Sequence, residues 1–130
     1  MKYGYTIVNV ESVGDTLNFY REAFGFETRF LHEAGDYGEL STGETTLAFA
    51  SHAMGEMNLG GNYVRCDTSE KPFGVELVFV ADDVNAAYAK AVAAGATPIK
   101  PPEHKPWGQL VGYVRSKEGS LIELCSAMGG

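Results

Sequence analysis

The sequence has few of the residues that build disulfide frameworks, metal clusters or membrane spans. Its 130 residues include only two cysteines, Cys66 and Cys125, which form neither a CxxC motif nor a metal-binding spacing. No apolar run approaches the roughly 20 residues that a bilayer-spanning helix needs, and the N-terminus lacks the apolar stretch of a signal peptide. We therefore expect a cytoplasmic protein with free thiols and no membrane association.

Positive charge is also scarce. Lysine and arginine total 10 residues against 17 acids, so the formal net charge is −7. A nucleic-acid-binding protein needs a basic patch, and this balance argues against that class. An acidic surface favours cationic or neutral ligands, although the same charge also serves solubility alone.

Histidines and familiar catalytic motifs are few as well. His32, His52 and His104 share no short metal-binding spacing, and we expect surface or turn roles for them. The sequence contains no GxSxG, no HExxH and no phosphate-binding glycine loop. Nothing in these absences names a reaction.

The chain does contain two isolated acids inside apolar segments. Glu76 lies within 75–80 and Glu123 within 121–125, and both segments have the composition of strands. Residues two apart share a face of a strand, and the neighbours of both acids at that spacing are apolar or glycine. A carboxylate on an apolar face is costly unless a metal, a cation, a ligand or water pairs with it.

The predicted elements repeat a strand, a helix and three strands on each side of a linker. Ser12 opens the first helix and Gly25 ends it; Asp82 or Asp83 opens the second and Gly95 ends it. The predicted strands span 5–10, 26–32, 37–41 and 45–50, then 73–80, 97–100, 109–115 and 120–126.

Matching residues at one offset suggest that the two halves are copies of one unit. Val10 and Val80 are 70 residues apart, and so are the helix-ending Gly25 and Gly95. We expect a single α+β domain over 1–130, with one βαβββ module at about 1–51, a linker over 52–72 and a second module at about 73–130. Two such small sheets can curl around a shared cleft.

The sequence resembles the glyoxalase, bleomycin-resistance and extradiol-dioxygenase superfamily, also called vicinal oxygen chelate. The segments that carry the resemblance cover nearly the whole chain; they are 18–21 with 25–26, 79–84 with 94–96, 107–109, 113–115 and 118–124. The resemblance implies a curled sheet of two βαβββ modules with a central cleft, and a homodimer. It fixes the fold better than the activity, because one scaffold supports many chemistries.

In metal-dependent relatives, four strand residues, usually His or Glu, hold one divalent ion. The resemblance places Tyr5, Ala48, Glu76 and Glu123 at those positions. Alanine has no side-chain donor, and a phenol with a pKa near 10 is a poor ligand at neutral pH. We therefore expect no tightly bound metal and no other cofactor, with Glu76 and Glu123 as weak candidates for Mg²⁺ or Ca²⁺. Alternatively, Arg115 or Arg65 neutralises the two acids.

Aromatic side chains add a second kind of ligand contact, because their faces bind flat apolar molecules and organic cations. Trp107 is the only tryptophan and lies in a loop rich in glycine and proline. The candidate ligand-binding residues are Tyr5, Phe49, Glu76, Trp107, Tyr113 and Glu123.

The leading hypothesis is a metal-independent protein of the bleomycin-resistance type, which sequesters an aromatic or cationic small molecule in a dimer cleft. The second hypothesis is a glyoxalase-type lyase or isomerase, in which Glu76 and Glu123 move protons or hold a weak metal. A third hypothesis is a subunit whose main partner is another protein.

Overall fold

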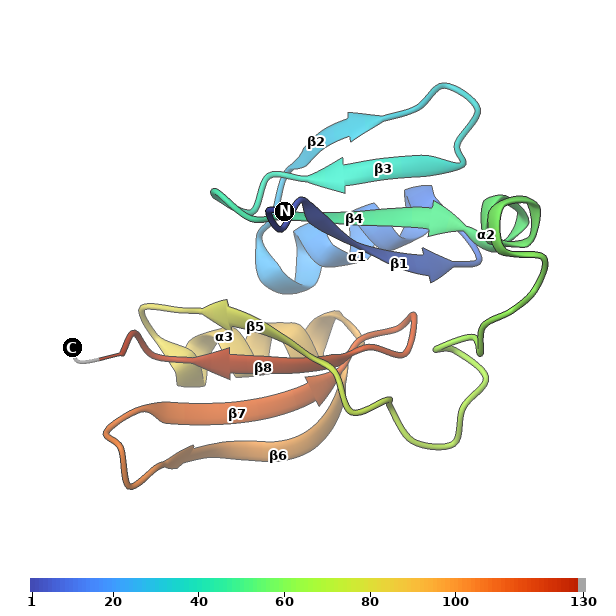
Figure 1. Ribbon diagram of the computed structural model, residues 1–130. Helices are drawn as coiled ribbons and strands as arrows, with labels where there is room; N and C mark the ends of the chain where they lie inside the picture. The colour runs from blue at the N-terminus through green and yellow to red at the C-terminus, as the bar shows by residue number, and fades with distance from the viewer. Residues whose placement is uncertain (129–130) are drawn as a thin grey trace. The chain divides into compact units, whose positions relative to one another are not determined.

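The computed structural model describes residues 1–128, and the chain divides into two compact units (Figure 1). The first unit is Met1–Asp67 and the second begins at Thr68, within the segment that we predicted to be a linker. Over the described residues, no helix is long and apolar enough to cross a membrane.

The first unit is a four-stranded mixed sheet with a helix on one face. Its elements are β1 (Tyr5–Val10), α1 (Val13–Phe24), β2 (Thr28–Leu31), β3 (Tyr37–Leu40), β4 (Thr46–Ser51) and α2 (His52–Leu59). The strand order is β1-β4-β3-β2, with β1 parallel to β4 and the other neighbours antiparallel. The predicted βαβββ order is confirmed.

The first helix begins and ends where the sequence predicted. The Ser12 hydroxyl accepts a hydrogen bond from the Asp15 amide at 3.2 Å, which satisfies one of the free amides at the helix start. Gly25 adopts a left-handed φ of 78° and donates its amide to the Arg21 carbonyl. The buried face of α1 includes Tyr20, whose ring lies 4.9 Å from that of Phe49 in β4.

The segment after β4 is not structureless, because it contains α2. Ser51 accepts a hydrogen bond from the Met54 amide at 3.1 Å, and Gly60 ends the helix at a φ of 61°. Both signals are present in the sequence, but Gly55 is the only buried residue of this helix. A helix without an apolar stripe gives no 3.6-residue pattern, so periodicity missed it.

The second unit repeats the arrangement of the first. Its elements are β5 (Glu76–Val80), α3 (Val84–Ala94), β6 (Thr97–His104), β7 (Leu110–Arg115) and β8 (Leu121–Cys125), in the sheet order β5-β8-β7-β6. Asp83, not Asp82, begins α3. The strand β6 runs past its predicted end at Lys100, through two prolines, because it is an edge strand with an irregular register.

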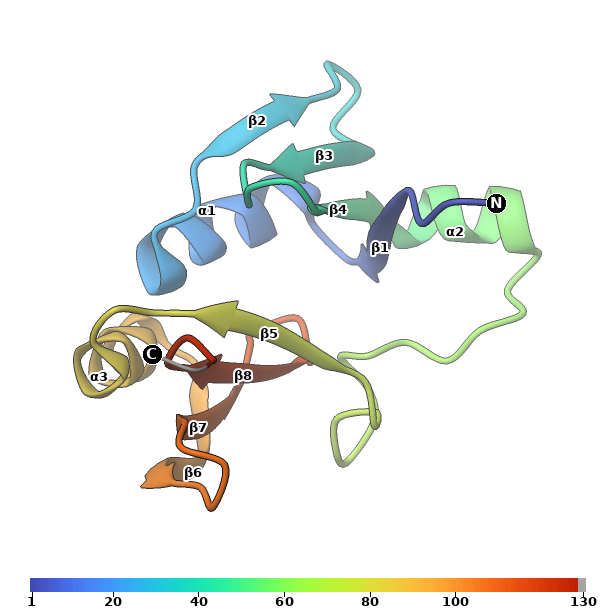
Figure 2. The ribbon, with the colours of Figure 1, turned by 60° about the vertical axis from the view of Figure 1, so that its left-hand side comes forward.

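Each sheet has one face covered by its helix and one face that the helix leaves uncovered, here called the open face (Figure 2). In the second unit, Gly112 faces α3, since a Cβ there would lie 3.2 Å from the Tyr88 ring. Strand residues alternate between faces, and register partners share one. Glu76, Tyr113 and Glu123 therefore lie on the open face of the second sheet.

Gly38 marks the tightest approach of α1 to its sheet. A Cβ at this position would lie 2.8 Å from Leu17 Cδ1 and 3.1 Å from Val13 Cγ1. We predict that Gly38→Ala lowers the free energy of unfolding by about 1–3 kcal/mol through overpacking. As a control, the Cβ of Gly14→Ala in the first turn of α1 would meet nothing within 4 Å, and the substitution should raise stability by up to about 1 kcal/mol. Urea unfolding of both variants checks this; equal effects would contradict the packing described.

Candidate functional site

The parallel pairing of β5 with β8 brings the two isolated acids together. Val78 is the register partner of Glu123, and Glu76 is two residues before Val78 on the same face of β5. Glu76 is therefore a diagonal neighbour of Glu123 across the strand pair. The resemblance implied that both acids face one cleft, and their apolar neighbours suggested burial. The structure places them side by side on one sheet, with Glu76 exposed and Glu123 half-buried.

The two carboxyl groups of this acid pair are close enough to interact. The contact with Glu123 raises the pKa of Glu76 above its ordinary value, and partial burial and the negative charge of Glu123 raise it further. Two ionised carboxylates repel each other, whereas a protonated Glu76 can donate a hydrogen bond to the Glu123 carboxylate. The pairing therefore favours the form in which Glu76 keeps its proton.

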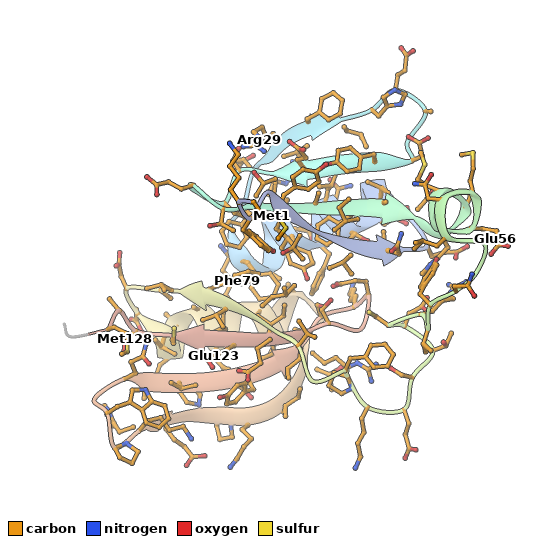
Figure 3. All side chains as sticks on the ribbon, in the orientation of Figure 1. Met1, Arg29, Glu56, Phe79, Glu123 and Met128 are labelled. Carbon is orange, nitrogen blue, oxygen red and sulfur yellow. The ribbon has the colours of Figure 1, made fainter. Side chains whose placement is uncertain are left out.

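Tyr113 completes the polar group at the acid pair. Its hydroxyl donates to Glu123 Oε1 at 3.2 Å across the β7–β8 ladder. Figure 3 labels Glu123 in the second sheet. Burial raises the pKa of Tyr113, and the negative charges of Glu123 and Glu76 raise it further. The phenol therefore remains protonated at neutral pH and keeps its donor role toward Glu123.

The surroundings of the acid pair are largely apolar. Val78 and Val80 lie on the same face of β5 and are exposed. Cys125 lies two residues beyond Glu123 and is buried; burial and the nearby Glu123 charge raise the pKa of its thiol. A thiol with a raised pKa is a weak nucleophile, so Cys125 contributes volume rather than reactivity.

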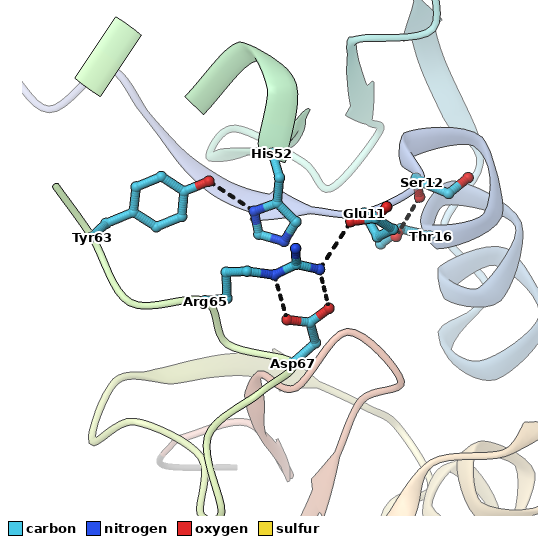
Figure 4. Close-up of polar contacts among 7 residues, drawn as sticks. All are labelled: Glu11, Ser12, Thr16, His52, Tyr63, Arg65 and Asp67. Atoms are coloured by element: carbon cyan, nitrogen blue, oxygen red, sulfur yellow. Dashed lines mark hydrogen bonds and ion pairs between the residues drawn. The ribbon is translucent and has the colours of Figure 1, made fainter. Parts of the chain in front are cut away.

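Neither arginine that the sequence offered as a partner accounts for the acid pair. Arg115 donates to the carbonyls of Ser69 and Glu70, both at 3.1 Å, and fixes the chain ahead of β5. Arg65 binds Asp67 at 2.8 Å and Glu11 at 2.9 Å (Figure 4). The shift in the pKa of Glu76 comes from Glu123 and from burial.

His52 has a structural role close to Arg65. Its Nδ1 shares a hydrogen bond with the Tyr63 hydroxyl at 2.8 Å, and the two rings stack with centroids 5.9 Å apart. Burial lowers the pKa of His52, and the positive charge of Arg65 lowers it further. The imidazole is therefore neutral at physiological pH and helps to pack the segment after α2 against the first unit.

The first sheet presents a different residue at the place of Glu123. Ile7 pairs with Ala48 as Val78 pairs with Glu123, so Ala48 is the positional equivalent of Glu123 and Tyr5 that of Glu76. Ala48 is fully buried and offers no side-chain donor. Over residues 1–128, no three His, Cys, Asp or Glu side chains lie close enough to hold a metal ion. These residues do not fit a tightly held metal.

The remaining predicted ligand contacts lie on other elements than the acid pair. Phe49 lies in the core under α1 and is fully buried, because odd-numbered residues of β4 face the helix. Tyr5 is exposed on β1 of the first unit. Trp107 lies in the β6–β7 turn, where its indole nitrogen donates to Gln109 at 2.7 Å. Tyr113 lies three residues beyond the start of β7 at Leu110, roughly 10 Å along that strand.

Sequence analysis missed a polar network on the open face of the first sheet. The Tyr37 hydroxyl donates to Glu39 Oε2 at 2.7 Å, and Arg29 Nη2 donates to Glu39 Oε1 at 2.8 Å. These bonds, that from Tyr37 foremost, lower the pKa of Glu39, and burial together with Glu39 raises the pKa of Tyr37. The spacing of Tyr37 and Glu39, two apart in a strand, was the available signal.

Comparison with known proteins identifies the family. The family model described as glyoxalase/bleomycin resistance protein/dioxygenase superfamily matches residues 2–124. The chain belongs to this superfamily. None of the curated proteins shows a significant sequence match to the chain.

Solved structures of glyoxalase-superfamily proteins share the fold. A glyoxalase-related enzyme from Fulvimarina pelagi is 20% identical with a TM-score of 0.80, over 98% of this chain and 88% of that one. A family enzyme from Burkholderia phytofirmans PsJN is 24% identical with a TM-score of 0.77, over 96% and 98%. TioX from Micromonospora sp. ML1 is 20% identical with a TM-score of 0.71, over 97% and 98%. At these identities the likeness shows the fold alone.

The raised pKa of Glu76 makes a prediction about stability. The folded protein holds this proton more tightly than the unfolded chain, so stability falls as pH rises from the unfolded pKa toward the folded pKa. Glu76→Gln removes that loss. We predict that the variant matches wild type near pH 4 and is more stable by about 0.2–1 kcal/mol at pH 8, the range for like charges on paired strands. Urea unfolding across this pH range measures the difference in stability between the variant and wild type. If the variant loses stability relative to wild type between pH 4 and pH 8, the raised pKa of Glu76 is contradicted.

Proposed function

We propose that this glyoxalase-superfamily protein binds an organic cation at the acid pair of the second sheet, without a metal and without transforming it. The observation that carries the proposal is the adjacency of Glu76 and Glu123 on the open, partly apolar face of the second sheet, which places negative charge there. Sequestration of the bleomycin-resistance type needs affinity alone, and such a site supplies it.

A cationic group suits the acid pair because it can replace the proton on Glu76. An ammonium or guanidinium group donates to both carboxylates, and its charge removes the repulsion that appears when both ionise. Tyr113 remains as a donor to Glu123, which fixes the position of that carboxylate. The exposed valines of β5 provide contact area for an apolar body attached to the cation.

The second candidate function is a glyoxalase-type lyase or isomerase. The raised pKa of Glu76 supports it, because a general acid–base group works best with a pKa near the working pH. In this alternative, Glu76 accepts a proton from the substrate and Glu123 takes the hydrogen bond from the newly protonated group. Turnover of a hemithioacetal that is lost in Glu76→Gln would favour this alternative over sequestration.

Ligand titration tests the proposed cation site. We predict that wild type binds bleomycin-like cations more tightly as pH rises from 5 to 8, because the acid pair loses its proton to solvent and the cation takes its place. Glu76→Gln should weaken a cationic ligand by about 1–3 kcal/mol, as for a hydrogen bond to a charged group. A neutral aromatic ligand should change little. Isothermal titration calorimetry measures each affinity.

Two controls sharpen the titration. Glu103→Gln removes an equal charge from an exposed position on the edge strand β6 and should leave both affinities unchanged. The double variant of Glu76 and Glu123 to glutamine should lose less than the sum of the single losses, since both residues serve one site. If Glu103→Gln weakens binding of the cation as much as Glu76→Gln does, the acids act only through the net charge of the protein, and the proposed cation site is refuted.

Metal content provides a separate prediction. Because Ala48 has no donor and Tyr5 is a poor one, we predict far less than one Ni, Zn, Fe or Mn per chain in protein purified without chelator. Cation binding should also survive treatment with EDTA. Elemental analysis that finds one transition metal per chain, or binding that EDTA abolishes and metal restores, would refute metal independence.

A further inference from the structure

A β-bulge turns two neighbouring side chains of the first unit onto one face. In β2, Thr28 pairs with Leu40 and Phe30 pairs with Glu39, so Arg29 is the extra residue between two successive partners. Such a bulge redirects a side chain and often lies next to a binding site. Here it places Arg29 and Phe30 together on the open face of the first sheet.

The guanidinium of Arg29 is held on one side only. Its Nε donates to Glu39 Oε1 at 3.1 Å, and its Nη2 donates to Glu39 Oε1 at 2.8 Å and to Thr46 Oγ1 at 2.7 Å. These three bonds use the hydrogens of Nε and Nη2. Among the described residues, the two hydrogens of Nη1 have no acceptor, and the side chain is 45% exposed.

Glu39 holds the guanidinium of Arg29 in place. Its Oε1 takes both bonds from Arg29, while its Oε2 takes the Tyr37 hydroxyl at 2.7 Å. The hydrogen bonds from Tyr37 and Arg29 hold the pKa of Glu39 below its ordinary value. The acid thus stays ionised and orders the Arg29 side chain. A ligand that binds this guanidinium therefore costs it less side-chain entropy.

Exposed aromatic rings lie on the same face of the sheet as this arginine. The Phe30 ring is 6.4 Å from the Tyr37 ring and 46% exposed. Tyr5, also exposed, lies on this face as the register partner of Thr46, which binds Arg29. A flat apolar body gains contact area on such rings while an anionic group on it reaches the arginine.

We infer that the open face of the first sheet contains a second binding site, in which Arg29 Nη1 binds the carboxylate of an aromatic acid and Phe30 contacts its ring. Thr46 and Glu39 are positioning residues, because they act through Arg29. A carboxylate is the preferred partner, since its negative charge strengthens the hydrogen bonds that the remaining hydrogens of Nη1 donate. This site lies within the first unit and does not rest on the proposed cation site.

Benzoate and benzamide serve as matched probes, because they differ in charge but hardly in shape. In NMR titrations of the full ¹⁵N-labelled chain at pH 7, benzoate should shift the Arg29 Nε–H signal and the amides of β2 and β3. Benzamide should bind at least about tenfold more weakly, as expected for loss of a charge-assisted hydrogen bond. Equal binding of the two probes, or shifts centred outside these strands, would overturn the site.

Three variants separate the role of Arg29 from general charge. Arg29→Gln should weaken benzoate at least about tenfold, whereas Arg21→Gln, on the exposed side of α1, should leave it unchanged. Thr46→Val keeps the guanidinium but removes one of its anchors, and should weaken benzoate a few-fold. If Arg29→Gln binds benzoate like wild type, the inference fails. If Arg29→Gln does not fold, the preference of wild type for benzoate over benzamide decides the question.

Discussion

The parallel pairing of the first and last strand of each unit is the constraint on which both candidate sites depend. β1 pairs with β4 and β5 with β8, so the chain must cross over through α1 or α3 before the last strand can form. The crossover helix covers one face of each sheet and leaves the other open. On that face, residues from the two ends of a unit become neighbours, which is why Glu76 meets Glu123 although much of the unit separates them in sequence.

One scaffold carries two different polar arrangements. Glu123 and Tyr113 are cross-strand partners in the second unit, and Ala48 and Glu39 occupy the equivalent places in the first. The acid of the first unit, Glu39, thus lies on β3 instead of β4, and there Arg29 binds it. The second unit pairs its acid with another acid. The glyoxalase-superfamily fold fixes where side chains can converge, while the identity of each side chain decides which charge a ligand must carry.

Local signals predicted the elements well, and longer-range geometry explains what was missed. Ser12 and Gly25 are capping residues whose chemistry acts within one turn, so they place α1 correctly. The residues of the open face could be inferred only in part. The alternation of side chains along a strand marked Glu76 and Glu123 as unusual acids. Their contact depends on the register between β5 and β8, which no local sequence pattern encodes. The Arg29 network was missed for the same reason, since it depends on a bulge. Phe49 was misplaced because its strand has apolar residues on both faces.

The contact with Glu123 raises the pKa of Glu76, and side-chain carboxyl NMR tests this coupling most directly. In protein with ¹³C-labelled glutamate, we predict that the Glu76 carboxyl titrates above its ordinary pKa, and that Glu123→Gln lowers the pKa of Glu76 toward that ordinary value. If Glu76 titrates at the ordinary pKa of a glutamate and does not respond to Glu123→Gln, the two acids are independent and the proposed pair is contradicted.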